Sequence, residues 1–150
     1  MKTYKITHET GTGQNDGGNS GESYFFTLIG SEGQTAAHIC PANRTLGQVG
    51  SCIVQDRTEI GELKAVRIKS VVKDSWAIVD FEVEIDGLAG IWRYKGKTML
   101  GHEGTVTLNF KYQSMYTFQS LVLLMITCAN LYYFALEKQM HNFIHEVLKL

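Results

Sequence analysis

All 15 glycines and the single proline of this 150-residue chain lie before residue 105. Both residue types favour turns, so the first part of the chain is expected to consist of short segments joined by turns. Beyond Phe110 neither residue occurs, and hydrophobic residues follow one another in continuous runs. The chain is therefore predicted to divide into two parts of different character, residues 1–112 and residues 113–150.

In the first part, hydrophobic residues recur at every second position. The clearest run is Val79, Phe81, Val83 and Ile85, which alternates with acidic residues. This period is typical of strands that bury one face, and Gly-rich turns between such strands favour a sandwich. We therefore predict an all-β fold, an antiparallel eight-stranded β-sandwich with an added C-terminal helix. The expected strands span residues 3–9, 23–30, 35–40, 49–54, 63–69, 76–86, 91–95 and 104–112.

The acidic residues of the strongest strand need partners. They are Asp80, Glu82, Glu84 and Asp86, and period two places them on one face. Arg67 and Lys69 alternate in the same way in an earlier segment. Cross-strand pairing between these two sets is the simplest explanation, because opposite charges on neighbouring strands stabilise a sheet.

The second part contains an uncharged run at residues 120–136, followed by an amphipathic segment. A helix over this run would be about 26 Å long, near the lower limit for crossing a bilayer. Three explanations compete. The segment is a C-terminal transmembrane helix, or a helix packed on the sandwich or on a partner, or a segment foreign to the domain.

Several short motifs follow one another in a recognisable order within residues 3–110. The most distinctive is Ile60-Gly61-Glu62-Leu63 with Val66-Arg67-Ile68, followed by Asp74-Ser75-Trp76 before a long strand. Further landmarks are residues 4–7, 20–24, 26–30 and 46–49. In this order they resemble the PLAT domain family, the β-sandwich domain of polycystins, lipoxygenases and α-toxin, in which an acidic-Trp pair also begins a long strand. The resemblance implies a non-catalytic module that binds lipid or protein.

The resemblance also suggests binding residues. Lipoxygenases of this family insert aromatic residues from loops into membranes, and Trp92, followed by Tyr94, falls near one such position. Tryptophan and tyrosine suit the bilayer interface because each joins an apolar ring to a polar group. Val71 and Val72 form an apolar pair between two lysines and are a second candidate for lipid or partner contact. Packing in the core is the alternative role for Trp92.

Calcium is the one cofactor that the resemblance raises. Family members that bind it use acidic side chains in loops at one end of the sandwich, and here Glu22, with Asp16, stands in such loops. Calcium prefers six to eight oxygen ligands, usually including several carboxylates. Two carboxylates are a meagre set, so calcium remains possible but no cofactor is required.

The three cysteines lack the spacing of a zinc site. Cys40 and Cys52 could pair in an oxidising compartment, but we interpret them as reduced, buried thiols. A net charge of −1 gives no support for nucleic-acid binding. No apolar leader follows Met1, so a cleavable signal peptide is not predicted.

These observations favour a module that docks on a membrane lipid surface or a partner protein through loops at the end of the sandwich. No catalytic arrangement is recognisable, so an enzyme is not expected. The expected localisation is membrane-associated or cytoplasmic, and the oligomeric state is left open. The alternative is a structural or interaction subunit whose C-terminal helix is buried in a larger assembly.

Overall fold

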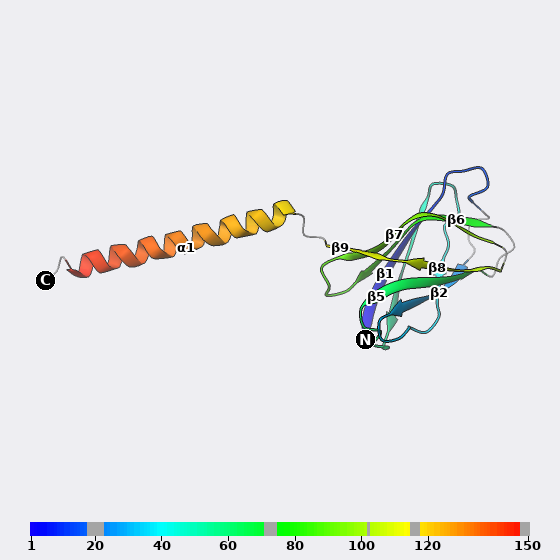
Figure 1. The fold of residues 1–150 in the computed structure, drawn as a ribbon, viewed down its shortest axis with the longest axis horizontal. Helices are drawn as coiled ribbons and strands as arrows, with labels where there is room; N and C mark the ends of the chain where they lie inside the picture. Colours follow the sequence, from blue (N-terminus) through cyan, green and yellow to red (C-terminus); the bar gives the residue numbers. More distant parts are fainter. Residues whose placement is uncertain (18–22, 71–74, 102, 115–117, 148–150) are drawn as a thin grey trace. The chain divides into compact units, whose positions relative to one another are not determined.

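A computed structural model describes residues 1–17, 23–70, 75–101, 103–114 and 118–147. The chain separates into two compact units, Met1–Ser114 and Met115–Leu150. The first unit contains all of the strands and the second contains one helix, α1 (Phe118–Val147) (Figure 1). The two units are described separately below.

The first unit is a sandwich of two antiparallel sheets, as the period-two pattern predicted. Among the described residues, one sheet has five strands in the order β4-β1-β6-β7-β9, and the other has four in the order β3-β2-β5-β8. The strands are β1 (Lys2–Thr10), β2 (Ser23–Gly30), β3 (His38–Pro41), β4 (Val49–Asp56), β5 (Leu63–Ser70), β6 (Trp76–Ile85), β7 (Ile91–Leu100), β8 (Thr105–Asn109) and β9 (Lys111–Gln113).

The core lies between the two sheets. Most strands contribute alternate side chains to it, such as Tyr4 and Ile6 from β1 and Phe26 and Leu28 from β2, all at most 1% exposed. Trp76 at the start of β6 is fully buried in the same cluster. Removal of this apolar surface from water is the main favourable contribution to the stability of the sandwich.

The sandwich has nine strands rather than the predicted eight, because the segment expected at residues 104–112 is divided at Phe110. Strand β8, before Phe110, pairs with β5 in the four-stranded sheet. Strand β9, after it, pairs with β7 in the five-stranded sheet. The backbone N–H of Phe110 donates to the carbonyl of Lys64, and its ring lies 6.2 Å from that of Phe81. Phe110 thus marks the crossing from one sheet to the other.

A bulge in β6 changes which of its residues face the core. The register with both β1 and β7 shifts between Ile78 and Asp80, and Val79 has no partner on either strand. Ile78 is fully buried beside Phe81, whereas Val79 is only half-buried. The predicted inner row of β6 is therefore wrong at Val79, because one extra residue in a strand reverses the alternation.

The prediction that the acidic face of β6 pairs with Arg67 and Lys69 is also wrong. Those two residues are on β5, which belongs to the other sheet. The carboxylates pair within their own sheet instead. Glu84 accepts a hydrogen bond of 2.7 Å from Lys5 on β1. Arg93 on β7 lies 3.0 Å from Asp80 and 3.1 Å from Glu82.

Cys40 and Cys52 form a disulfide bond, which corrects the interpretation of these residues as reduced thiols. Strands β3 and β4, which carry them, are edge strands of different sheets. Their Cα atoms lie 5.7 Å apart, within the range that a disulfide spans. The short β3–β4 connection brings the two edges together, so the bond joins the sheets along one side of the sandwich.

The second unit is helix α1. Its first turn contains no acidic residue. Consecutive residues near its middle, Leu131, Tyr132, Tyr133 and Phe134, are each at least 66% exposed. Successive residues point about 100° apart on a helix, so apolar side chains cover all of its sides here. In the part of α1 whose side chains the structure describes, no stretch is long and apolar enough to cross a membrane.

Candidate functional site

The strand directions define two ends of the sandwich. Trp76 pairs with Leu100 at one end, which we call the Trp76 end. Tyr4 pairs with Ile85 towards the other, which we call the Ile85 end. The chain from Ser70 to Trp76 joins two strand ends at the Trp76 end. Val71 and Val72 belong to this connection but lie outside the described residues, as does Glu22.

Trp92 lies towards the Ile85 end, because its neighbour Ile91 pairs with Glu84. Its side chain is 7% exposed and belongs to the core. The ring centroid lies 5.0 Å from that of Tyr112, which is 52% exposed. Ser70 and Trp76, the described residues on either side of the valine pair in the sequence, are at the opposite end from Trp92.

Tyr94 is half-buried and packs against the core. Its hydroxyl lies 2.6 Å from that of Thr98 on the same strand. Because Tyr94 pairs with Phe81 in the middle of β6, it lies on the body of the sandwich and not in a loop. Its ring position is fixed by packing and by this hydrogen bond.

Asp16 has its carboxylate engaged within the protein. Lys97 lies 2.5 Å from Oδ1, and the backbone N–H of Gly13 donates to Oδ2 over 2.9 Å. The Lys97 ammonium, and then the Gly13 N–H, lower the pKa of Asp16 below its usual value. A Cβ atom on Gly11 would lie 2.3 Å from Oδ2, so glycine at this position makes room for the carboxylate. Residues 11–17, the described part of the glycine-rich loop that follows β1, are folded around Asp16.

A buried polar cluster supports the loops of the Trp76 end. Arg44 is fully buried, with its guanidinium 5.2 Å from the centroid of the Trp76 ring. It also donates to the Ser70 hydroxyl over 3.1 Å. The Trp76 indole N–H donates to the Thr10 hydroxyl over 2.9 Å, and that hydroxyl donates to the carbonyl of Asn43. These contacts fix the loop at residues 42–48 on the end of the sandwich.

His8 is part of the same cluster and is 1% exposed. Its Nδ1 lies 3.1 Å from the hydroxyl of Tyr24, and its Nε2 accepts a hydrogen bond from the N–H of Asn43. Burial, helped by the charge of Arg44, lowers the pKa of His8 to about 4. The ring is therefore neutral near pH 7, and it serves as an acceptor that holds the same loop.

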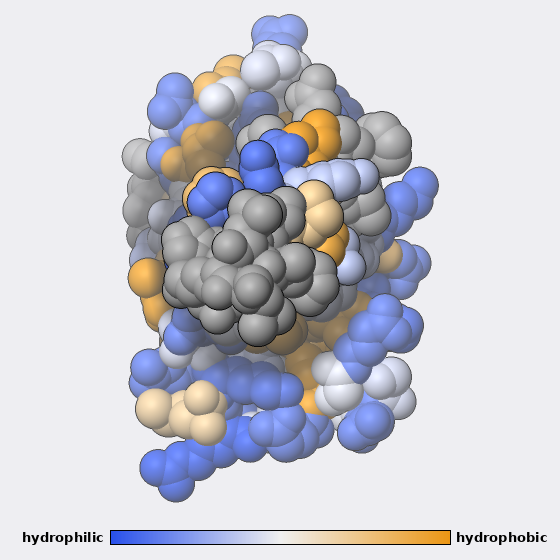
Figure 2. Space-filling view, turned by 90° about the vertical axis from the view of Figure 1, so that its left-hand side faces the viewer, coloured by the Kyte–Doolittle hydropathy of each residue, from blue (hydrophilic) through white to orange (hydrophobic). Residues whose placement is uncertain are grey.

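Large apolar side chains are exposed around this end. Leu46 is 44% exposed, Val49 55% and Met99 46%. Leu46 is in the supported loop and Val49 begins β4 directly after it. Elsewhere, on the face seen in Figure 2, apolar side chains with described positions form small patches between polar ones. Exposed apolar side chains that lie together can mark a contact surface, which makes this end a candidate.

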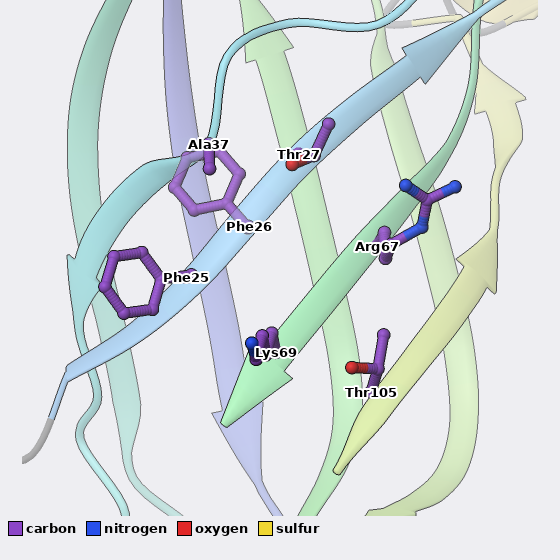
Figure 3. A pocket seen from close by; sticks show the side chains of 7 residues that line it. All are labelled: Phe25, Phe26, Thr27, Ala37, Arg67, Lys69 and Thr105. Carbon is purple, nitrogen blue, oxygen red and sulfur yellow. The ribbon is translucent and has the colours of Figure 1, made fainter. Parts of the chain in front are cut away.

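Sequence reasoning missed a hollow on the outer face of the four-stranded sheet. It has a volume of about 330 Å³ (Figure 3). The alternation in β5 did place Arg67 and Lys69 on an outer face, but no pattern in the chain showed which strands are their neighbours. The lining residues are Phe25, Phe26, Thr27, Ala37, Arg67, Lys69 and Thr105.

Among the described residues, no group of three or more histidine, cysteine or acidic side chains is arranged to hold a metal ion. Asp16, one of the two predicted ligands, is paired with Lys97. The other, Glu22, is outside the described part of the chain. Of the two predicted calcium ligands, the structure therefore describes one, and its carboxylate is paired with a lysine.

The fold was compared with solved structures. A lipoxygenase variant with an internal deletion matches 74% of this chain at a TM-score of 0.64 and 13% identity. Coral 8R-lipoxygenase, described as activated by calcium via a C2-like domain, matches 72% at 0.62 and 13% identity. A calcium-dependent 11R-lipoxygenase matches 73% at 0.60 and 19% identity. No protein-family profile and no curated protein sequence matches the chain.

These matches confirm the resemblance to the PLAT sandwich at the level of the fold. The chain covers 17% of each lipoxygenase chain. The similarity therefore concerns a β-sandwich domain of these enzymes. At such low identity it carries no residue roles from one protein to the other.

Proposed function

We propose that the sandwich is a non-catalytic module that docks on a membrane lipid surface through the loops of the Trp76 end. The lipoxygenases with this fold support a regulatory or attachment role, since calcium activation of the coral enzyme is ascribed to its C2-like domain. The proposed partner is membrane lipid, with no nucleic acid involved.

The observation that carries the proposal is the exposure of Leu46 and Val49 beside a rigidly supported loop. From the sequence alone we further propose Val71 and Val72, flanked by Lys69 and Lys73, as contact residues; their positions lie outside the described residues. Apolar side chains gain free energy by entering the acyl region, and lysines are attracted to anionic headgroups. A preformed loop loses little conformational entropy when it docks.

We propose further that docking does not require calcium and that the module works in an oxidising compartment. Lys97 already neutralises Asp16, which supports the first point. The Cys40–Cys52 disulfide supports the second, because such bonds persist outside the reducing cytosol. The cytoplasmic alternative of the sequence-based prediction is therefore not retained in this proposal.

The test is sedimentation of the full chain with vesicles of phosphatidylcholine and phosphatidylserine. The double variant Leu46→Asp/Val49→Asp is expected to lower the partition coefficient by about tenfold or more, which corresponds to roughly 1.4 kcal/mol. Ile53→Asp is the matched control, since Ile53 is 69% exposed on β4 away from this end. Helix α1 is the same in every variant, so it cannot account for a difference between them.

Equal partitioning of the double variant and wild type would overturn docking by these loops. Equal losses in the double variant and in Ile53→Asp would also overturn it, because the effect would then not depend on the Trp76 end. The vesicles are tested with calcium and with excess chelator, and the proposal expects the same partitioning in both.

The exposed apolar surface of α1 favours a second candidate function, a structural subunit whose helix is buried in a protein assembly. A helix that is apolar on all sides is normally covered. Leu131 and Phe134, 66% and 69% exposed, are suitable probes because both project from the described part of α1.

Light scattering after size-exclusion chromatography tests this second function. Wild type is expected to form oligomers that Leu131→Glu/Phe134→Glu converts to monomers. The control is Gln139→Glu, which adds charge to the same helix at a polar position. A monomeric wild-type chain would exclude self-assembly through α1.

A further inference from the structure

The hollow on the outer face of the four-stranded sheet has the form of a small-molecule site. Its volume of about 330 Å³ lies at the low end of the range for ligand sites. Three adjacent strands line it, with Phe25 on β2, Lys69 on β5 and Thr105 on β8 (Figure 3). Regular strands hold all three positions, so the hollow is preformed.

The floor of the hollow is apolar. Phe25 pairs with Ile39 on β3 on one side and with Lys69 on the other. Ile39 is 56% exposed and Phe25 is half-buried, although both are on the outer face of the sheet. Ala37 is exposed next to them. The solvated face of an antiparallel sheet normally carries polar side chains, so this apolar strip needs an explanation.

The rim of the hollow is basic. Arg67 and Lys69 alternate on β5 and lie about 7 Å apart along the strand (Figure 3). Within the described part of the chain, neither forms an ion pair with a carboxylate. Arg67 donates to the amide oxygen of Gln34 over 3.4 Å. By contrast, Arg93 and Lys5 on the other sheet are each paired with acidic residues.

Among the described residues, the positions that pair with Arg67 and Lys69 on β8, and Thr27 on β2, carry hydroxyl groups and no acid. Arg67 pairs with Thr27 on one side and with Thr107 on the other, and Lys69 pairs with Thr105. These side chains can donate to an anion without repelling it. The positively charged rim is therefore suited to bind the anionic group of a ligand. The apolar floor is suited to bind an apolar group of the same ligand.

We propose that the hollow binds a long-chain monocarboxylate, a fatty-acid type of ligand. Arg67 binds the carboxylate through its planar pair of N–H groups, and Lys69 with Thr105 completes the anion contacts. The hydrocarbon chain lies over Phe25 towards Ala37 and Ile39. The small volume fits a single chain and not the paired chains of a phospholipid. This site does not depend on the proposed docking loops.

The test uses dodecanoate below its micellar concentration, with calorimetry and amide NMR on the full chain. Saturable binding is expected, with shifted amide signals at Phe25, Thr27 and Thr105. Dodecanol tests the need for the charge and butanoate tests the need for the chain, and both are expected to bind at least tenfold more weakly. Binding of dodecanol as tight as that of dodecanoate would overturn the proposed carboxylate contact.

Two variants locate the site. Arg67→Gln/Lys69→Gln and Phe25→Ser are each expected to weaken dodecanoate binding tenfold or more, with an unchanged fold by circular dichroism. Arg57→Gln is the matched control, because Arg57 is exposed and outside the hollow. No binding of dodecanoate by wild type would overturn the proposal. Unchanged binding in both hollow variants would overturn it as well, and is the result expected if the ligand binds to α1.

The same variants separate this proposal from the docking function. Phe25→Ser is expected to keep wild-type partitioning to phosphatidylserine vesicles while it loses dodecanoate. Leu46→Asp/Val49→Asp is expected to lose vesicle binding and keep dodecanoate. Failure of one assay therefore leaves the other informative.

Discussion

The Lys97 ammonium group lies 2.5 Å from Oδ1 of Asp16, so one of the two predicted calcium ligands is already paired with a side chain of the protein. Lys97 is on β7 and Asp16 is in the glycine-rich loop after β1. The ion pair therefore ties this loop to the five-stranded sheet. Its energetic contribution is modest because Lys97 is half-exposed, but its location is specific.

We predict that Lys97→Met loosens the loop at residues 11–17. Loss of the ammonium raises the pKa of Asp16 towards its usual value and removes one of the two contacts that hold the carboxylate. Amide hydrogen exchange at Gly13 and Asp16 should become faster. Lys95→Met is the control, since Lys95 is exposed on the same strand. Equal exchange in the two variants would refute a structural role for the pair.

A second prediction concerns pH. Because the pKa of His8 is lowered to about 4 from 6.5, the unfolded chain binds a proton at mildly acidic pH before the folded protein does. Stability is therefore lost as the pH falls from about 6.5 to 4, by about 3 kcal/mol in total. Urea unfolding between pH 7 and 5 measures this slope.

The comparison variant for this pH prediction is His8→Gln. It is expected to be less stable at pH 7 but to show a much flatter pH profile over the same window.

Asp56 contributes a further loss of stability at still lower pH, because its pKa is also lower in the folded protein than in the unfolded chain. Burial raises the pKa of Asp56, but hydrogen bonds from Thr58, His38 and Ala36 outweigh it and lower the value to about 2. An unchanged slope in His8→Gln would show that another group titrates.

A third prediction concerns the disulfide. Loss of the Cys40–Cys52 bond should lower the free energy of unfolding by about 2–4 kcal/mol, because the reduced chain gains entropy when it unfolds. Cys52→Ala is the test variant, measured by urea unfolding. Cys128→Ser is the control and should retain the bond. Thiol titration of the denatured, unreduced protein should find a single free cysteine, and three would contradict the structure.

A fourth prediction separates the two roles considered for Trp92. Its side chain is 7% exposed, so Trp92→Ala should cost about 3–5 kcal/mol of stability by leaving a cavity. Leu88→Ala, in the turn before β7, should change stability by no more than about 0.5 kcal/mol, since Leu88 is 53% exposed. If Trp92→Ala instead remained stable and lost vesicle binding, Trp92 would be a membrane-contact residue.

The sequence predicted the sandwich well because period two reports which side chains face inward. It could not report which strands are neighbours, since the same alternation suits either sheet. Arg67 and Lys69 were therefore assigned to the acidic face of β6, whose actual partners are Lys5 and Arg93. The same error explains why the hollow was not predicted. Arg67 and Lys69 were interpreted as partners of the β6 carboxylates, so they were not considered as cations that could bind a ligand.

The other errors have local causes. Alternation continues through Phe110 although the chain changes sheets there, because its side chain faces the core shared by both sheets. The bulge at Val79 adds one residue with no compositional signal. The pairing of Cys40 with Cys52 depends on β3 and β4 meeting at the edge, which a count of three cysteines does not reveal.

The bond between the edges of the two sheets also has a mechanical consequence. Under tension on the chain ends, residues 40–52 cannot be drawn out while Cys40 and Cys52 remain joined. About 40 Å of contour length is thereby withheld from an extending chain, at roughly 3.4 Å per residue. Reduction would release this length, so a stretched molecule would report the redox state of its surroundings as a change in how far it extends.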